Sequence, residues 1–333
     1  MDRSHPRRLL FTLALILGLG VVGVASVAFG MRDISFTDVW AALQGHTDTV
    51  DQAAAHQRIP RTILAMIIGA ALAVSGTTMQ AITRNPLADP GIFGVLAGAA
   101  LAVVIGIAFF GLNNQVSTFF VAIIGSAAAA IFVYTVGSLG GAGATPLTLA
   151  LAGAATAAAA TSLVSAILLP RVDVMDTFRF WQIGNVGGAD FEQMALAAPF
   201  LIVGGLLCWG SATGLNALAL GDDIATGLGA RTGTTRLVST LGAVTLCGVA
   251  TALAGPIGFV GLIIPHLCRL LVGTDHRWLM PITALAGAIL LVSADTLGRV
   301  VNRPSEIAVA VLTPIIGAPL FIWIVRRTKA REL

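Results

Sequence analysis

The chain has 333 residues, of which 56% are hydrophobic and only 11% charged, and its formal net charge is +3. Its mean hydropathy is +0.91, which excludes a soluble globular protein because such a protein exposes far more charge; the small basic excess does not indicate a nucleic-acid partner. Repeated apolar runs of about 20 residues can each cross a hydrocarbon core about 30 Å thick, so the sequence predicts an all-α polytopic membrane protein.

The first quarter of the chain combines two apolar runs with a polar insertion. A basic leader precedes the run at 9–30, which is longer than the core of a signal peptide and therefore predicts a retained first span. The insertion at 31–57 contains a candidate amphipathic helix at 35–43. The second span is expected to begin at Pro60, because proline is favoured in the first helical turn, and to continue to about residue 82.

Eight further apolar runs bring the expected number of spans to ten. They lie at 92–110, 116–138, 147–169, 194–211, 235–254, 257–272, 279–300 and 306–325. The run at 257–272 is short. Gly255-Pro256 precedes it, and Pro265-His266 lies within it. Such an interrupted segment predicts a broken or tilted helix that lines a cavity.

Ten spans place both termini on one side of the membrane. If that side is cytoplasmic, it holds twelve of the 19 lysine and arginine residues and the far side holds seven. This distribution agrees with the positive-inside tendency. The sequence therefore predicts cytoplasmic termini and places the polar segment 215–236 in the cytoplasm.

The segment 215–236 is too polar to cross a bilayer, since it contains Asp222, Asp223 and two arginines. Its apolar positions alternate with polar ones and are Leu218, Leu220, Ile224, Ala225 and Leu228. This pattern predicts short amphipathic helices broken at Gly221 and at 227–229. We interpret the segment as a surface on which another protein acts; an ordinary loop between spans is the alternative.

Several other polar residues have a structural interpretation. Asn85 and Asp89 are expected to hold the turn at 83–91 through hydrogen bonds from the backbone to their side chains. His266 follows a proline and is expected to be a packed or loop-capping residue rather than a metal ligand. Three cysteines lie in different apolar runs without the spacing of a metal site and are expected to be buried: Cys208, Cys247 and Cys268.

The chain contains no nucleotide-binding motif. Lys329 is its only lysine, and no G-x-x-x-x-G-K-[ST] phosphate loop is present. If transport uses ATP, the hydrolysing site must lie on another polypeptide.

Several stretches occur in order along nearly the whole chain. They are R-I-P-R at 58–61, G-A-A-L-A at 69–73 with Gln80, R-N-P-L-A-D-P-G at 84–91, L-N-A-L-A-L-G-D at 215–222, G-P-I-G-F-V-G-L-I-I-P-H at 255–266, and the segments 294–299 and 317–321. Together they resemble the permease subunits of ATP-binding-cassette (ABC) importers for ferric siderophores, haem and cobalamin. The stretch at 84–91 and F-R-F-W at 178–181 look most like the ferric-siderophore branch.

The resemblance implies a single transmembrane permease domain over 1–333, with the ten-helix, BtuC-like fold of type II importers. It implies a multi-pass subunit of the cytoplasmic (inner) membrane that moves a ferric siderophore inward by alternating access, with haem and cobalamin as alternative substrates. The implied partners are a second permease, with a heterodimer favoured over a homodimer, two cytoplasmic ATPase subunits that bind ATP and Mg, and an extracytoplasmic substrate-binding protein. The chain itself would be no enzyme and would bind no cofactor or metal.

The resemblance also assigns roles to residues. The residues expected to couple to the ATPase are Leu218, Leu220, Gly221, Asp222, Asp223, Ala225, Leu228, Gly229 and Arg231. The arginines expected to receive carboxylates of the binding protein are Arg58, Arg61 and Arg299, for which anchoring to lipid headgroups is the alternative. Asp295 is expected to pair with Arg299, four positions on.

The transport pathway is weakly marked. Its candidate lining or gating residues are Thr77, Thr78, Gln80 and Asn85. The small residues at 69–76 are equally consistent with helix packing. A bulky chelate needs a wide, weakly binding passage, so we expect no conspicuous charged site.

Two rival functions remain at this stage. A transporter driven by an ion gradient would need acidic or histidine residues in the middle of its spans, and the sequence has essentially none. A non-transporting scaffold would leave the segment 215–236 without a purpose.

Overall fold

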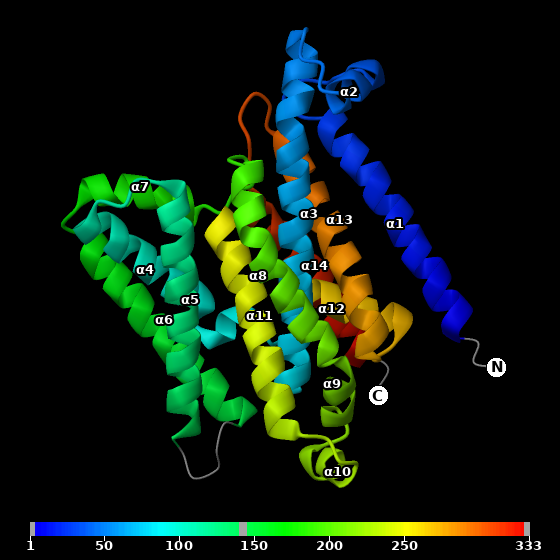
Figure 1. Ribbon diagram of the computed structural model, residues 1–333, viewed down its shortest axis with the longest axis vertical. Coiled ribbons are helices and arrows are strands. Elements are labelled where there is room, and N and C mark those ends of the chain that lie inside the picture. The colour runs from blue at the N-terminus through cyan, green and yellow to red at the C-terminus, as the bar shows by residue number, and fades with distance from the viewer. Residues whose placement is uncertain (1–3, 140–144, 330–333) are drawn as a thin grey trace.

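The computed structural model describes residues 4–139 and 145–329. Within these ranges seven helices are long and apolar enough to cross a membrane. They are α1 (Ser4–Ala28), α3 (Val50–Thr83), α5 (Gln115–Ser138), α6 (Pro146–Leu168), α8 (Phe191–Gly210), α11 (Thr232–Ala254) and α13 (His276–Val301). In Figure 1 they form a bundle of roughly parallel and antiparallel helices. The prediction of an all-α membrane protein is confirmed.

Three further apolar helices occupy the remaining predicted runs: α4 (Val95–Phe110), α12 (Val260–Val272) and α14 (Val309–Lys329). With 13 residues and a rise of about 1.5 Å per residue, α12 is about 20 Å long, which is less than the hydrocarbon thickness. Phe259 precedes it in a left-handed conformation, with φ of 70°. The run is therefore too short for a full span, as its length suggested, but α12 continues through Pro265, so the predicted break is not seen; its place beside a cavity and the ten crossings stay predictions.

One predicted helix start is wrong. Helix α3 begins at Val50, ten residues before Pro60, and Thr49 caps it by accepting a hydrogen bond from the Gln52 amide at 3.2 Å. Pro60 lies inside the helix. Because this proline is near the polar end of the span, water and neighbouring side chains can satisfy the carbonyl that its missing N–H leaves free.

Five short elements lie between the apolar helices. The predicted amphipathic helix at 35–43 is present as α2 (Phe36–Leu43). The others are η1 (Pro90–Phe93), α7 (Val172–Gln182), and the pair α9 (Ala212–Leu218) and α10 (Asp222–Gly227). Gly221 separates α9 from α10 with φ of 110°, a value that favours glycine. The predicted short helices with breaks at Gly221 and at 227–229 are therefore confirmed.

Helix α3 runs through the centre of the bundle, where small residues allow close contacts. A Cβ atom on Gly69 would lie 2.3 Å from the Gly287 carbonyl oxygen on α13, and one on Gly76 would lie 2.0 Å from that of Gly261 on α12. No side chain larger than hydrogen fits at either position. The helix-packing interpretation of 69–76 is thus confirmed.

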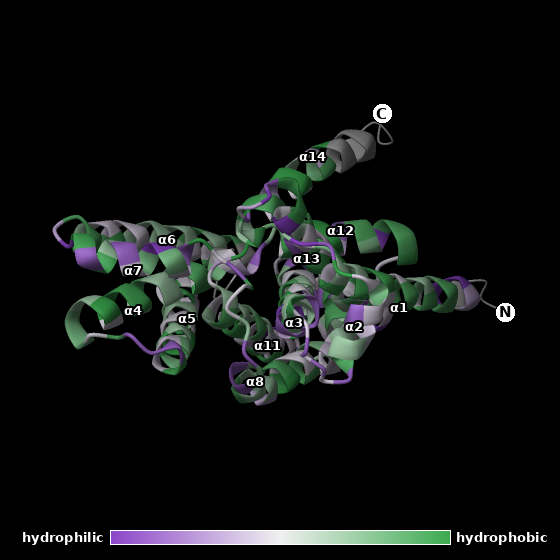
Figure 2. Cartoon of the chain, turned by 90° about the horizontal axis from the view of Figure 1, so that it is seen from above, coloured by the Kyte–Doolittle hydropathy of each residue, from purple (hydrophilic) through white to green (hydrophobic). Residues whose placement is uncertain are grey.

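The outer helices expose most of their apolar surface. Over the most apolar 18 residues of each helix, 72% of α3 is buried, whereas only 17% of α1 and 17% of α6 are buried. Seen from above in Figure 2, α4 to α7 lie on one side of the central helices, α1 lies on the other, and α14 projects away from the bundle. The exposed faces therefore remain available to lipid or to further subunits.

The bundle has two polar ends, which we name from Figure 1. The upper end carries α2, α7 and the α13–α14 loop (302–308), and the lower end carries α9, α10 and the α3–α4 turn. The start of α1 and the end of α14 lie in the lower half. The elements expected to face the cytoplasm thus share one end, and the expected docking arginines lie toward the other.

Candidate functional site

The lower end presents an apolar ridge. Leu220, Ile224 and Leu228 are 57%, 56% and 68% exposed, and their spacing of four residues aligns them along α10 and its flanks. Leu218 and Ala225 are instead buried in the chain. Of the apolar residues proposed from sequence for coupling, two therefore lie on the ridge; Ile224 joins them, and the four-residue spacing in the sequence is the signal for it.

Asp222 is held by two arginines from distant parts of the chain. Nη2 of Arg236, in the first turns of α11, lies 2.9 Å from both carboxylate oxygens. Nη2 of Arg84, the left-handed C-cap of α3, donates to Oδ1. Asp222 thus ties α10 to both α3 and α11, whereas Asp223 and Arg231 are exposed.

A second set of contacts ties α9 to the bundle. Asn216 donates to Asp275 at 2.7 Å and accepts from the His276 amide at 2.9 Å, at the start of α13. Nη1 of Arg8 on α1 lies 3.9 Å from the same aspartate. The α9–α10 pair is therefore bonded directly to α3, α11 and the start of α13, and through Asp275 to α1.

The turn after α3 is built as its residues predict. Oδ1 of Asn85 accepts a hydrogen bond from the Leu87 amide at 2.9 Å, and Oδ1 of Asp89 accepts one from the Gly91 amide at 2.8 Å. These bonds confirm the structural role of both side chains. The turn also presents Arg84 to Asp222.

The candidate pathway residues on α3 lie in helix contacts. Thr77, Thr78 and Gln80 are all buried. Oγ1 of Thr77 lies 3.1 Å from that of Thr283 on α13, and Nε2 of Gln80 donates to the Gly261 carbonyl of α12 at 3.1 Å. In this conformation Thr77 and Gln80 join α3 to α13 and α12, whereas Oγ1 of Thr78 donates to the Val74 carbonyl of its own helix at 2.9 Å.

Helix α6 offers a different surface. Its middle and upper part exposes a row of small or hydroxyl-bearing residues: Ala154, Ala158, Thr161, Ser162 and Ser165. The three hydroxyls donate to carbonyls one turn earlier, at 2.8 to 3.0 Å. The hydroxyl protons of the row are thus already used within α6.

The upper end contains a buried ion cluster. Arg61 of α3 donates from Nε to both oxygens of Asp295 at 3.1 Å and from Nη2 to Oδ1 at 2.8 Å. Nε of Arg299 lies 3.1 Å from Oδ2 of the same carboxylate, so the predicted Asp295–Arg299 pair is confirmed. Asp295 is 1% and Arg299 2% exposed.

Each of the three candidate docking arginines already has partners in the chain. Arg299 donates to the Ser26 carbonyl at 3.0 Å, and Arg58 to the carbonyls of Val27 and Arg32 at 3.0 and 2.9 Å. Nη1 of Arg61 donates to Oε2 of Glu306 at 2.8 Å. Arg299 lies in the interior in this conformation, whereas Arg58 and Arg61 reach the surface in part.

Two more ion pairs connect the upper loops. Arg32 lies 3.4 Å from Asp51, and Arg303 donates to both oxygens of Asp33. The hydrogen bond from Arg303 holds the pKa of the Asp33 carboxyl below its usual value. The first of these pairs ties the α1–α2 connection to α3, and the second ties it to the α13–α14 loop.

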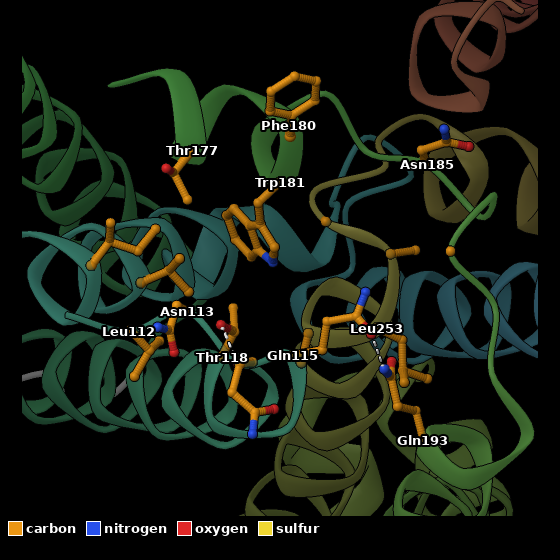
Figure 3. A pocket seen from close by; sticks show the side chains of 17 residues that line it. Leu112, Asn113, Gln115, Thr118, Thr177, Phe180, Trp181, Asn185, Gln193 and Leu253 are labelled. Atoms are coloured by element: carbon orange, nitrogen blue, oxygen red, sulfur yellow. Dashed lines mark hydrogen bonds between the residues drawn. The ribbon is translucent and has the colours of Figure 1, made fainter. Parts of the chain in front are cut away.

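An uncharged cavity of about 350 Å³ also opens near the upper end. Its floor is apolar, and its polar lining consists of Asn113, Asn114, Gln115, Thr118, Thr177, Asn185 and Gln193, with Phe180 and Trp181 from α7. Figure 3 shows Gln193 of α8 donating to Gln115 of α5 across one side. This cavity was not predicted from the sequence, although N-N-Q at 113–115 between two apolar runs was a signal for it.

The remaining candidates have structural roles. All three cysteines are buried, as expected. The His266 ring packs edge-on against Phe321, with ring centroids 6.3 Å apart. Among the described residues no group of three or more His, Cys, Asp or Glu side chains is arranged to hold a metal ion.

Comparison with known proteins gives a consistent result. The profile of the FecCD transport family matches residues 17–327. The probable siderophore transport system permease protein YfiZ of Bacillus subtilis is 40% identical over 316 residues, 95% of each chain. The ferric enterobactin transport system permease protein FepD of Escherichia coli is 40% identical over 314 residues, 94% of each chain. The hemin transport system permease protein HmuU of Yersinia pestis is 36% identical over 335 residues, 99% of this chain and 98% of HmuU.

The fold is similar to a solved structure described as an inward-facing conformation of a metal-chelate type ABC transporter. The TM-score is 0.84 at 29% identity, over 96% of this chain and 99% of that chain. Because the family profile, the relatives and the fold all span nearly its whole length, the chain belongs to the FecCD transport family of ABC transporter permease subunits.

Proposed function

We propose that this chain is the membrane-spanning subunit of an importer that carries a ferric siderophore across the cytoplasmic membrane, driven by ATP and Mg bound to two partner ATPases. Two relatives at 40% identity, one a probable siderophore and one a ferric enterobactin permease, support this substrate class. The observation that carries the proposal is the exposed apolar ridge on α10, which is joined by hydrogen bonds to the central helices. Haem is the second candidate, since HmuU matches at 36% identity.

The lower end is proposed to face the cytoplasm and both termini with it, in agreement with the distribution of basic residues. Each ATPase would bury the ridge of Leu220, Ile224 and Leu228 in a groove, the usual way in which an amphipathic helix binds. Arg231 and Asp223 are exposed beside it and would set the register. Asp222 would act from within, by passing movement of α10 to α3 and α11.

The upper end is proposed to receive an extracytoplasmic substrate-binding protein. Arg58 and Arg61 would pair with its carboxylates, because a planar guanidinium can bind a carboxylate through two parallel hydrogen bonds. Arg299, which is buried, would support this surface by fixing Asp295 and the end of α1.

The substrate path is proposed to run between this chain and a second permease, preferably an unlike one. Close contacts such as Gly69 with Gly287 fill the interior of the chain. The exposed row on α6 suits a wall of this path, since small and internally bonded side chains bind a chelate weakly. ATP-driven movement of α10 would then open the path to one side at a time.

Uptake of radiolabelled iron tests the function. Cells that lack their own siderophore permeases, supplied with this chain and its ATPase, should accumulate iron from a siderophore, and unlabelled haem should not compete. Iron uptake that requires no ATPase, or that follows a proton or sodium gradient alone, would contradict the proposal.

Thiol labelling tests the path. Ser162→Cys on α6 should react with a membrane-impermeant maleimide in the assembled transporter. The three natural cysteines are buried and should therefore add little background labelling. Val203→Cys, which is exposed on α8 among the apolar residues Ile202 and Leu206, is the control and should stay unlabelled in lipid. Equal labelling at the two positions would remove α6 from the path.

A further inference from the structure

The arginines at the upper end already bind carboxylates of this chain before any partner protein docks. Arg61 uses one edge of its guanidinium for Asp295 and Nη1 for Glu306, at 2.8 Å. We propose that Glu306 is a displaceable internal carboxylate, which occupies the docking position on Arg61 until an acidic residue of the binding protein replaces it. This inference rests on the proposed function, since it concerns how the binding protein docks.

Burial decides which partner of Arg61 can leave. The Asp295 side chain is 1% exposed and also faces Arg299, so its departure would leave two arginines without their shared carboxylate in the interior. The Glu306 side chain is 26% exposed and lies at the rim. Water can solvate Glu306 once it is released, and the incoming carboxylate keeps Arg61 paired. Only the Glu306 contact can therefore be exchanged without leaving a buried charge uncompensated.

The position of Glu306 gives the exchange a consequence. It belongs to the α13–α14 loop, in which the neighbouring Ile307 amide donates to the Gly298 carbonyl at 3.0 Å. Helix α14 begins three residues later at Val309, and the Ala310 amide donates to the Gly184 carbonyl beside α7 at 3.3 Å. Release of Glu306 thus loosens the loop that fixes the start of α14, the helix that projects from the bundle in Figure 2. Docking at the upper end would in this way alter the contacts that hold the start of α14 near α7.

The same end of the chain provides a matched control. Asp33 is an exposed carboxylate that, like Glu306, forms an ion pair with an arginine at the upper end. Its partner is Arg303 and not Arg61. Asp33→Asn and Glu306→Gln remove the same charge from the same end. Any general electrostatic effect on an acidic partner is therefore common to both, while relief of competition at Arg61 belongs to Glu306 alone.

The experiment measures binding of the iron-chelate-binding proteins of the same genome, each purified and loaded with ferric siderophore, to the permease–ATPase complex in nanodiscs. Glu306→Gln should tighten binding about fivefold, the effect of removing one rim ion pair that competes for the same arginine. Glu306→Asp keeps the charge but shortens the reach by one methylene, and it should tighten binding in the same direction. Asp33→Asn should change affinity by less than about twofold.

The outcomes separate two failures. Equal effects of Glu306→Gln and Asp33→Asn, or weaker binding by Glu306→Gln, would overturn the displacement of Glu306 and leave the importer function in place. Absence of binding to the wild-type complex by every such protein would overturn the proposed docking and this inference with it.

Discussion

At the lower end of the bundle, Asp222 joins α10 to α3 and α11 in an open setting, with 47% of its side chain exposed. At the upper end, Asp295 joins Arg61 and Arg299 with 1% exposed. Both carboxylates bind two arginines, but the first can rearrange in water, whereas the second cannot without a large free-energy cost. The difference indicates a lower end that can move and an upper end with a fixed, buried ion cluster. Only one contact of that cluster, Arg61 with Glu306, is exchangeable.

The largest expected effect tests the buried ion cluster of Arg61, Asp295 and Arg299. Asp295→Ala leaves two arginines in the interior without their shared partner and should lower the free energy of unfolding by about 3 to 5 kcal/mol. Thermal unfolding of the purified chain in nanodiscs measures it. Asp33→Ala is the control, because it removes an exposed carboxylate from a similar pair and should lower the free energy of unfolding far less. Similar losses in the two variants would show that burial does not distinguish the sites.

The next effect concerns the apolar ridge. Ile224→Asp places a charge in the surface proposed to enter the ATPase groove, and should weaken ATPase binding about 100-fold, as truncated interface anchors do. Folding should be unaffected, since the residue is exposed. Thr226→Asp, on the same short helix but away from the ridge, is the control. Equal loss in both variants, or in neither, would contradict the assigned ridge; co-purification and surface plasmon resonance provide the measurement.

A smaller effect separates the two roles considered for Asp222. Asp222→Asn weakens the contacts with Arg84 and Arg236, so it should lower siderophore uptake per ATP hydrolysed about tenfold while changing stability by less than about 1 kcal/mol and leaving ATPase binding intact. The reversed pair Asp222→Arg with Arg236→Asp should restore part of the uptake. Loss of ATPase binding in Asp222→Asn would instead favour the direct contact predicted from sequence.

The smallest effect tests the upper loops by pH. Because Arg303 lowers the pKa of Asp33 in the folded chain, the pair contributes stability above the unfolded pKa of about 4 and loses it as the pH falls through the lower folded pKa. The wild type and Asp33→Asn should therefore differ slightly in unfolding temperature at pH 6, and the difference should disappear as the pH falls below the folded pKa of Asp33. A difference that grows toward pH 3 would contradict the pairing.

Much of the fold and part of the candidate site could be predicted from the sequence. Apolar run length located the helices, and Gly221 together with the spacing of Leu220, Ile224 and Leu228 marked the two short helices of the lower end. The start of α3 was wrong because the rule that places Pro60 in a first turn ignores a cap at Thr49. The carboxamide-lined cavity was missed because its residues come from several separate helices and loops.

Local composition, periodicity and motif order by themselves established a membrane protein, its helices and its family, since each of these depends on neighbouring residues. Only the tertiary structure decided which polar residues face inward. Asp222 bonds Arg84 across 138 positions, and Arg61 bonds Asp295 and Glu306 across 234 and 245 positions. Such pairs exist because folding brings distant helix ends together, and the buried Asp295 also needs partners because it lies away from water.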